Sequence, residues 1–265
     1  MQNRIIASLL STVLAGMLAA CGGAGAHSNG QALASAVSAL QTLNPAQPPG
    51  SNFNLAPFTL QLPTGSAGKV DTVNGSSLAA GYTNPYYFYT DSVDGAMVMM
   101  DPTQGRTTSG SLHARTEMRE NAIWSSNGSN KLDATVAVTK VPGKTTIGQI
   151  FQGTGPSKPL CELQVTSGGA VNLLLEDSNQ GGSAKVYPIT SVPVGTLFNY
   201  ELGLTGSTIS VTVNDTVKTF TMDSSFNGES FYFKAGDYDQ TAVSGTPLTT
   251  PGTIVKFYAL TLTHQ

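Results

Sequence analysis

The sequence predicts an all-β domain over residues 53–265, built as a sandwich of two antiparallel sheets. Short runs of alternating apolar and polar residues fill this region, and turn-forming residues divide them. Many short strands with frequent turn signals are typical of a sandwich. No long stretch here repeats its apolar residues at the helical period of 3.6 residues. A domain of about 210 residues buries roughly 70% of its unfolded surface, which is enough for one large core.

Individual strands follow from this pattern in chain order. Residues 197–204 and 208–213 are expected to form a hairpin across Thr205-Gly206-Ser207. A further strand, residues 216–220, is expected after the turn at Asn214-Asp215. The last run is rich in β-branched and aromatic residues, which favour strands. The expected strands are residues 131–138, 171–176, 197–204, 208–213, 216–220 and 254–262.

Residues 1–20 have the pattern of a bacterial lipoprotein signal peptide. Arg4 supplies a positive start, the following residues are almost all apolar, and residues 18–21 (LAAC) fit the cleavage box. The apolar run is too short and too rich in Ala and Gly for a confident membrane span. We expect a lipidated Cys21, and Gly22 after it favours the outer membrane of a Gram-negative cell, facing the periplasm or the surface. The alternative is an ordinary secretory signal with a chance cysteine.

Residues 21–52 are rich in Gly, Ala, Ser, Gln and Pro, and they are expected to form a flexible tether between the lipid anchor and the domain. Once Cys21 is lipidated, Cys161 stands alone and no intramolecular disulfide can form. Cys161 alternates with Leu163 and Val165, so a buried thiol of the core is expected.

Composition narrows the classes of partner. The chain has 13 basic and 16 acidic side chains, so we expect no nucleic-acid partner. Three histidines without ligand spacing give no support for a metal site, and no cofactor is expected. We expect a monomer whose only contact with a membrane is the lipid anchor.

Residues 232–240 (YFKAGDYDQ) are the most informative stretch. In a strand, alternate side chains point to opposite faces. Tyr232, Lys234, Tyr238 and Gln240 then share one face, which suits an anionic sugar and proton transfer better than a core. A solvated surface strand explains the same pattern equally well.

Residues 111–120 supply a second polar face with His113, Arg115, Glu117 and Arg119, while Leu112, Ala114, Thr116 and Met118 lie opposite. The planar fork of arginine suits carboxylate recognition. The competing interpretation is a surface ladder in which Glu117 bridges the two arginines. In residues 147–152, Gln149 and Phe151 share a face.

Together these segments resemble the alginate lyases of polysaccharide lyase family 7. That family carries R-[ST]-E-L-R, Q-[IV]-H and Y-F-K-A-G-x-Y-x-Q strands in this order. This chain has RTEMR at residues 115–119, QIF at residues 149–151 and the complete third motif at residues 232–240. Residues 58–65 look like the first strand of the family. The resemblance implies a β-jelly roll whose concave sheet forms the substrate cleft.

The resemblance also implies chemistry. The family cleaves uronate polymers by β-elimination, which needs a neutralised C6 carboxylate, a base at C5 and an acid at O4. By this resemblance Arg115 and Gln149 hold the carboxylate, and Tyr238 donates to O4. Lys234, Arg119 and Gln240 would line neighbouring subsites, and Tyr232 and Glu117, which lie on the same polar faces, are expected to bind substrate as well.

Phe151 is the departure from the family, which has histidine there as a carboxylate contact and base. Three explanations compete. Tyr238 serves as both base and acid, or His113 compensates from the same predicted face, or the protein only binds glycans. Phe151 would also offer an apolar surface to a sugar ring.

The absence of this histidine predicts which uronate polymer is the substrate. In β-D-mannuronate and β-D-glucuronate the C5 proton and O4 leave from the same side of the ring, so one tyrosine can serve both. In α-L-guluronate they leave from opposite sides, and a second group is needed. We therefore expect a mannuronan-type alginate, with glucuronan as an alternative and a non-catalytic glycan-binding lipoprotein as the alternative outside enzymes.

Overall fold

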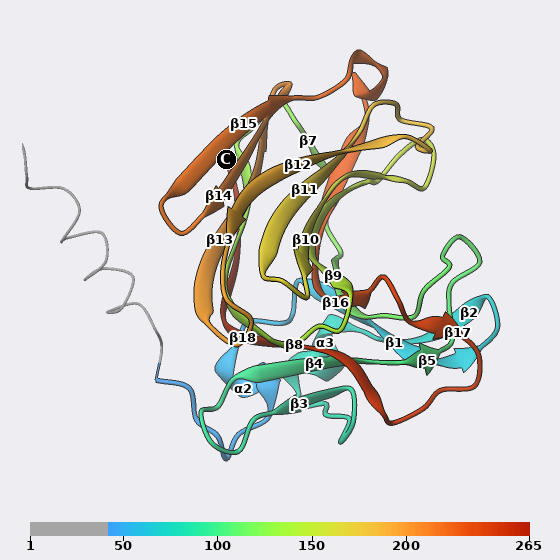
Figure 1. Ribbon diagram of the computed structural model, residues 1–265, viewed down its shortest axis with the longest axis vertical. Coiled ribbons are helices and arrows are strands. Elements are labelled where there is room, and N and C mark those ends of the chain that lie inside the picture. The colour runs from blue at the N-terminus through green and yellow to red at the C-terminus, as the bar shows by residue number, and fades with distance from the viewer. Residues whose placement is uncertain (1–41) are drawn as a thin grey trace, which may run out of the picture. The chain divides into compact units, whose positions relative to one another are not determined.

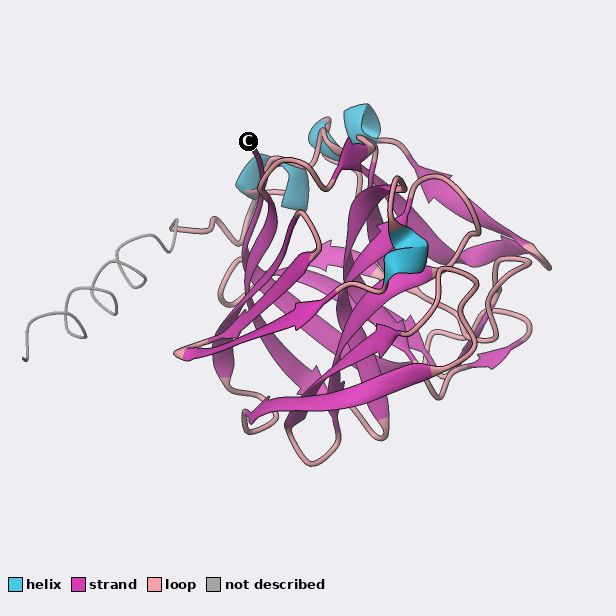
Figure 2. Cartoon of the chain, turned by 90° about the horizontal axis from the view of Figure 1, so that it is seen from above, coloured by secondary structure: helices cyan, strands magenta, loops and turns pink. Residues whose placement is uncertain are grey.

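The computed structural model describes residues 42–265, and the expected signal peptide and Cys21 lie outside this part. Two large antiparallel sheets pack face to face in it (Figure 1). Short helices lie outside the sheets (Figure 2): α2 (Pro49–Asn52), α3 (Gly75–Ala79) and the 3-10 turn η1 (Ser224–Phe226). Among the described residues, no helix has the length and apolar character that a membrane span requires.

The first sheet runs in the order β12-β11-β10-β9-β16-β6-β1-β2, and β7 pairs with the start of β16. Within residues 42–265 its strands are β1 (Phe58–Ser66), β2 (Lys69–Val73), β6 (Thr116–Glu120), β7 (Trp124–Ser125), β9 (Lys144–Gln152), β10 (Pro159–Thr166), β11 (Ala170–Glu176), β12 (Ala184–Ser191) and β16 (Ser230–Asp239).

The second sheet runs in the order β15-β14-β13-β8-β18-β4-β3, and two short strands, β5 and β17, form a separate parallel pair. Their bounds are β3 (Phe88–Thr90), β4 (Met97–Pro102), β5 (Gln104–Gly105), β8 (Asn130–Lys140), β13 (Leu197–Thr205), β14 (Thr208–Val213), β15 (Thr216–Thr221), β17 (Val243–Ser244) and β18 (Pro251–His264). The predicted all-β sandwich of two antiparallel sheets is confirmed.

The core lies between the two sheets because each strand alternates. In β11 and β14 every second side chain is buried, so each strand gives one face to the core. The predicted hairpin is confirmed, since Thr205 pairs with Thr208 across a turn in which Gly206 has a φ of 59°. Cys161 is the expected buried free thiol, and burial raises its pKa to about 12.

The predicted strand over residues 111–120 is only half right. A turn closes from Ser111 N to Thr108 O, and regular pairing begins at Thr116. Leu112, expected on the face opposite His113 and Arg115, is 82% exposed. The alternation before Thr116 therefore belongs to a loop, where no neighbouring strand fixes the faces.

The packed part of the chain begins earlier than residue 53. Leu43 packs against the core, Pro49 is buried, and Asn52 Nδ2 donates to Asn44 O at 3.0 Å and Gly95 O at 3.3 Å. Residues 43–52, assigned to the tether, are thus part of the folded body. The apolar side chain of Leu43 and the side-chain amide of Asn52 hold this segment against the domain.

Candidate active site

A cavity of about 480 Å³ opens on the outer face of the first sheet, the face turned away from the second sheet. Strands β6, β16, β9 and β10 supply its floor, and the loops around residues 108–110 and 157–159 supply walls. Its lining includes Gln61, Thr108, Ser109, Gly110, Arg115, Arg119, Gln149, Phe151, Ser157, Lys158, Pro159, Glu162, Glu176, Gly182, Tyr232, Lys234 and Tyr238.

Strand pairing brings four polar side chains of the floor into one row. Arg119 pairs with Lys234, Lys234 with Gln149, and Gln149 with Glu162, so the row crosses four neighbouring strands. Directly paired side chains lie within contact range of each other. Their sequence neighbours, such as Phe233, face the core. The faces predicted for Lys234 and Gln149 are therefore confirmed.

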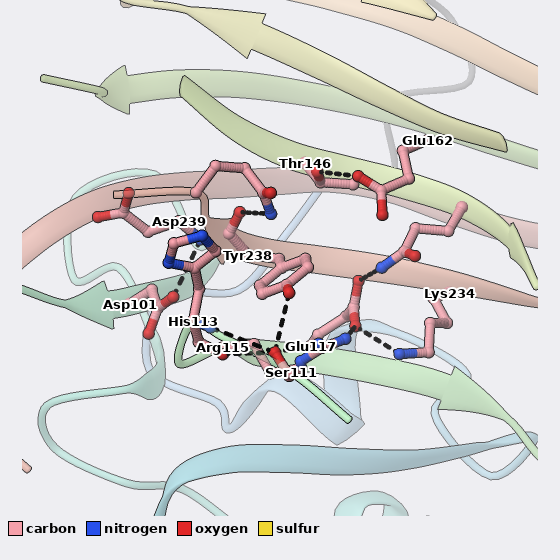
Figure 3. A network of polar contacts seen from close by, with 12 residues as sticks. Asp101, Ser111, His113, Arg115, Glu117, Thr146, Glu162, Lys234, Tyr238 and Asp239 are labelled. Carbon is pink, nitrogen blue, oxygen red and sulfur yellow. Dashed lines mark hydrogen bonds and ion pairs between the residues drawn. The ribbon is translucent and has the colours of Figure 1, made fainter. Parts of the chain in front are cut away.

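Glu117 is fully buried beneath this floor and holds three donors (Figure 3). Its Oε2 accepts from Arg115 Nη1 at 2.8 Å and from Lys234 Nζ at 2.9 Å, and its Oε1 accepts from Gln149 Nε2. Gly236 allows this close packing, because a Cβ there would lie 2.6 Å from the Glu117 backbone. The carboxylate thus fixes the positions of both cations.

Burial and charge set the protonation of this network. Burial would raise the pKa of Glu117, but the charges of Lys234 and Arg115 and their hydrogen bonds outweigh it and hold that pKa below its usual value. Burial and the neighbouring Arg115 lower the pKa of Lys234 to about 8, although Glu117 opposes the shift. Lys234 therefore titrates close to the physiological range.

Tyr238 lies against Arg115, whose Cζ is 3.7 Å from the centre of the phenol ring. Ser111 Oγ lies 2.9 Å from the Tyr238 hydroxyl and also accepts from Arg115 Nη2 at 3.0 Å. Burial raises the pKa of Tyr238, and Arg115 and the Ser111 hydrogen bond oppose the shift only in part. In the free site the phenol therefore keeps its proton.

Aromatic rings cover the other end of the floor. Phe151 and Tyr232 are stacked with their ring centres 5.4 Å apart. Arg119 Cζ lies 4.2 Å from the centre of the Tyr232 ring, and Lys234 Nζ lies 4.9 Å from that of Phe151. Arg119 has no carboxylate partner among residues 42–265, so its charge is available to an anionic ligand.

Carboxylates on the opposite face of β16 anchor the strand that carries Tyr238. Asp237 accepts from the hydroxyls of Thr145 and Thr253 at 2.7 and 2.6 Å and from the backbone N–H of Asp101. Asp101 in turn accepts from the backbone N–H of Asp239 at 3.0 Å. Burial raises the pKa of Asp101 well above its usual value and that of Asp237 to about 7.

Three predicted site residues do not line the cavity. His113 lies in the loop before β6, and its Nδ1 is 2.8 Å from Ala242 O, which ties the ring to the loop behind Tyr238. Gln240 lies beyond the end of β16 and donates to the backbone of Tyr238. Glu117 supports the cavity from below instead of lining it, and it bridges Arg115 to Lys234, not to Arg119.

Ser111 and Glu162 are two of the polar residues at the site that carry no assignment from the sequence. Ser111 positions the Tyr238 hydroxyl from a loop, and nothing in its local sequence marks that role. Glu162 lines the cavity from β10, where its Oε2 accepts from Thr146 Oγ1 and Gln164 Nε2 at 3.0 Å each. The available signal is one acid on the polar face that alternates with the apolar residues of this strand. No cluster of three or more His, Cys, Asp or Glu in the described residues could hold a metal ion.

Comparison with known proteins places this geometry beside one family. Residues 53–264 match the sequence profile described as alginate lyase. A curated relative, an alginate lyase of Klebsiella pneumoniae, is 27% identical over 82% of this chain and 91% of its own length.

Solved structures agree with the sequence comparison. The structure of alginate lyase A1-II′, a member of polysaccharide lyase family 7, superposes with a TM-score of 0.72 at 30% identity and covers 82% of this chain and 98% of its own. A variant of the same enzyme in complex with product (GGG) gives a TM-score of 0.73 at 29% identity, over 83% of this chain and all of its own. An alginate lyase of Pseudomonas aeruginosa gives 0.71 at 26% identity, over 80% of this chain and 99% of its own. The jelly-roll expectation is confirmed by these matches.

Proposed function

This chain belongs to the alginate lyase family, and we propose that it is a polysaccharide lyase that cleaves a β-1,4-linked uronate polymer by β-elimination. The observation that carries the proposal is the buried charge network under the cavity. In this network Glu117 holds the side chains of Arg115, Lys234 and Gln149 in the floor of the cavity, next to the hydroxyl of Tyr238. Relatives that carry the name alginate lyase support the same reaction class.

The floor supplies the electrostatic part of the reaction. Removal of the C5 proton leaves negative charge on the C6 carboxylate, and preorganised donors in a buried site stabilise such charge strongly. Lys234 and Gln149 line the cavity beside Arg119, while Glu117 balances one of the two buried cations below. The floor therefore keeps an excess of positive charge for a uronate carboxylate.

Tyr238 supplies the proton transfer. Its raised pKa means that it enters the reaction as a phenol, which suits an acid for O4. One hydroxyl can give its own proton to O4 while its oxygen receives the proton from C5, so a free phenolate is not required. Arg115, which lies over the ring, stabilises negative charge on the oxygen during the exchange.

This single-residue exchange favours D-configured uronates, whose C5 proton and O4 leave from the same side of the ring. Phe151 occupies the position at which the family has a histidine, and its ring packs on Tyr232 instead of offering a base. We therefore propose a mannuronan-type alginate as the preferred polymer. Glucuronan differs from mannuronan only at C2, so the same reasoning allows it.

The test is a set of initial rates for the mature protein on pure mannuronan, glucuronan and polyguluronate, followed by the ultraviolet absorbance of the unsaturated uronate product. We expect both D-uronans to be cleaved faster than polyguluronate. Tyr238→Phe keeps the ring under Arg115 and should lose about 10²–10⁴-fold in kcat/KM. Absence of any product would favour a glycan-binding protein, and fastest cleavage of polyguluronate would refute the preference.

We also propose that the protein is an outer-membrane lipoprotein anchored through Cys21. The lipobox at residues 18–21 supports this localisation, and the packed body begins about twenty residues after it. The intervening segment would place the cavity away from the membrane surface, where a long polymer has access.

A further inference from the structure

Glu162 is an acidic side chain in a cavity that is otherwise suited to anions. It lines the cavity from β10, and its neighbours in the row across the sheet are Gln149 and then Lys234. A negative charge in this position opposes the binding of a polyanion. Its presence therefore suggests a role in chemistry and not in affinity.

The hydrogen bonds of Glu162 leave one oxygen for a ligand. Its Oε2 accepts from Thr146 and Gln164, whereas Oε1 has no hydrogen-bond partner within the described chain. Figure 3 shows the carboxyl group directed from β10 toward the space above the Glu117 network. Burial raises the pKa of Glu162, which brings a carboxyl group closer to the basicity that a general base needs at neutral pH.

Glu162 and Tyr238 face this space from different sides. Tyr238 is on β16, Glu162 is on β10, and β9 lies between these strands. Neighbouring strands are about 4.8 Å apart, so the two strands are separated by roughly 10 Å. That separation leaves room for a sugar ring between a phenol on one side and a carboxylate on the other.

We propose that Glu162 is a second proton-transfer residue of this site, used in a slower side reaction on uronates whose C5 proton and O4 lie on opposite sides of the ring. This inference rests on the proposed lyase function. In α-L-guluronate, Glu162 Oε1 takes the C5 proton, and the C5 electron pair forms the C4–C5 double bond. The C4–O4 bond breaks, and O4 takes the phenol proton of Tyr238. Solvent then returns the proton from the Glu162 acid to the Tyr238 phenolate.

Other side chains fit this role less well. His113 is held by Ala242 and does not line the cavity, and Phe151 has no basic atom. Glu176 also lines the cavity, but it lies on β11, one strand farther from Tyr238. Among the acidic side chains of the wall, Glu162 therefore lies on the strand nearer to Tyr238, two residues from Gln164, which is in register with Tyr238 through Thr146.

The test compares Glu162→Gln with the unmodified mature protein on polyguluronate and on mannuronan. Glutamine keeps the length of the side chain and an acceptor oxygen for Thr146, but it cannot take a proton. We expect kcat/KM on polyguluronate to fall by about 10²–10⁴-fold. On mannuronan we expect a much smaller change, because Tyr238 acts alone there.

Glu176→Gln is the matched control, since it removes the other acidic side chain of the wall. It should leave the ratio of the two rates unchanged, and melting temperatures of both variants check their folding. Equal losses on both polymers, or no loss on polyguluronate, would overturn the role of Glu162. A wild-type protein that cleaves mannuronan but not polyguluronate would overturn it too, while the lyase function would stand. Failure to cleave any uronan would instead remove the proposed function itself.

Discussion

The protonation of Lys234 should limit activity at alkaline pH. Its ammonium group lies in the cavity floor, where it is placed to meet the substrate carboxylate, and its pKa is lowered to about 8. The charged fraction is then about 90% at pH 7, about half at pH 8 and about a tenth at pH 9. If only the charged form supports the reaction, kcat/KM on mannuronan falls about tenfold from pH 7 to pH 9.

One variant separates the titration of Lys234 from that of other groups. Tyr238 has a pKa above its usual value near 10, so it retains its proton through this range. Lys234→Arg replaces the ammonium by a guanidinium that does not titrate below pH 12. The decline in kcat/KM should therefore move above about pH 10 in this variant, whatever its absolute rate. Asp237, with a pKa of about 7, would titrate in both proteins, so its effect on kcat/KM is the same in both pH profiles.

The assay records initial ultraviolet rates from pH 6 to pH 10 at constant ionic strength, with limiting and saturating mannuronan. A bound uronate carboxylate stabilises the ammonium form, so kcat should decline at higher pH than kcat/KM. The reasoning is refuted if Lys234→Arg shows the same decline near pH 8. It is also refuted if the unmodified protein keeps a constant kcat/KM up to pH 9.5.

Two further predictions concern stability and localisation. The pKa values of Asp101 and Asp237 are raised above those of the unfolded chain, so the unfolded state releases these protons first as the pH rises. The melting temperature should therefore fall between about pH 4 and pH 7, and Asp101→Asn should flatten this dependence; an unchanged slope in the variant contradicts it. Cys21→Ser should release the protein from the membrane fraction of cells, and its continued sedimentation with membranes would disprove the lipid anchor.

Much of the fold follows from period-two patterns, because each strand has one face in a large core. The faces of β9 and β16 are predictable for this reason, and the β13–β14 hairpin follows from its turn residues. The alternation also puts Arg115 on the side of the cavity, even though its segment is a loop. It directly precedes β6, and its bond to Glu117 fixes its direction.

The site residues that the sequence misassigns or misses have one physical cause, which is contact between segments that are distant in the chain. His113 alternates correctly with Arg115, but a carbonyl at Ala242 holds its ring outside the cavity. Glu162 is the only acid of β10, and its place in the site follows only from the pairing of β10 with β9. Neither relation is present in the local sequence, since each depends on pairing across long stretches of chain.

The energetic cost of the buried network argues for catalysis over simple glycan binding. Glu117, Arg115 and Lys234 are nearly inaccessible to solvent, and removing such charges from water costs several kcal/mol per ion unless the geometry repays it. A binding protein could hold a uronate with arginines at the surface and avoid that cost. Donors that are buried and fixed in advance have most value where charge develops during a reaction. Their position beside the protonated hydroxyl of Tyr238 therefore favours a lyase over a binding protein.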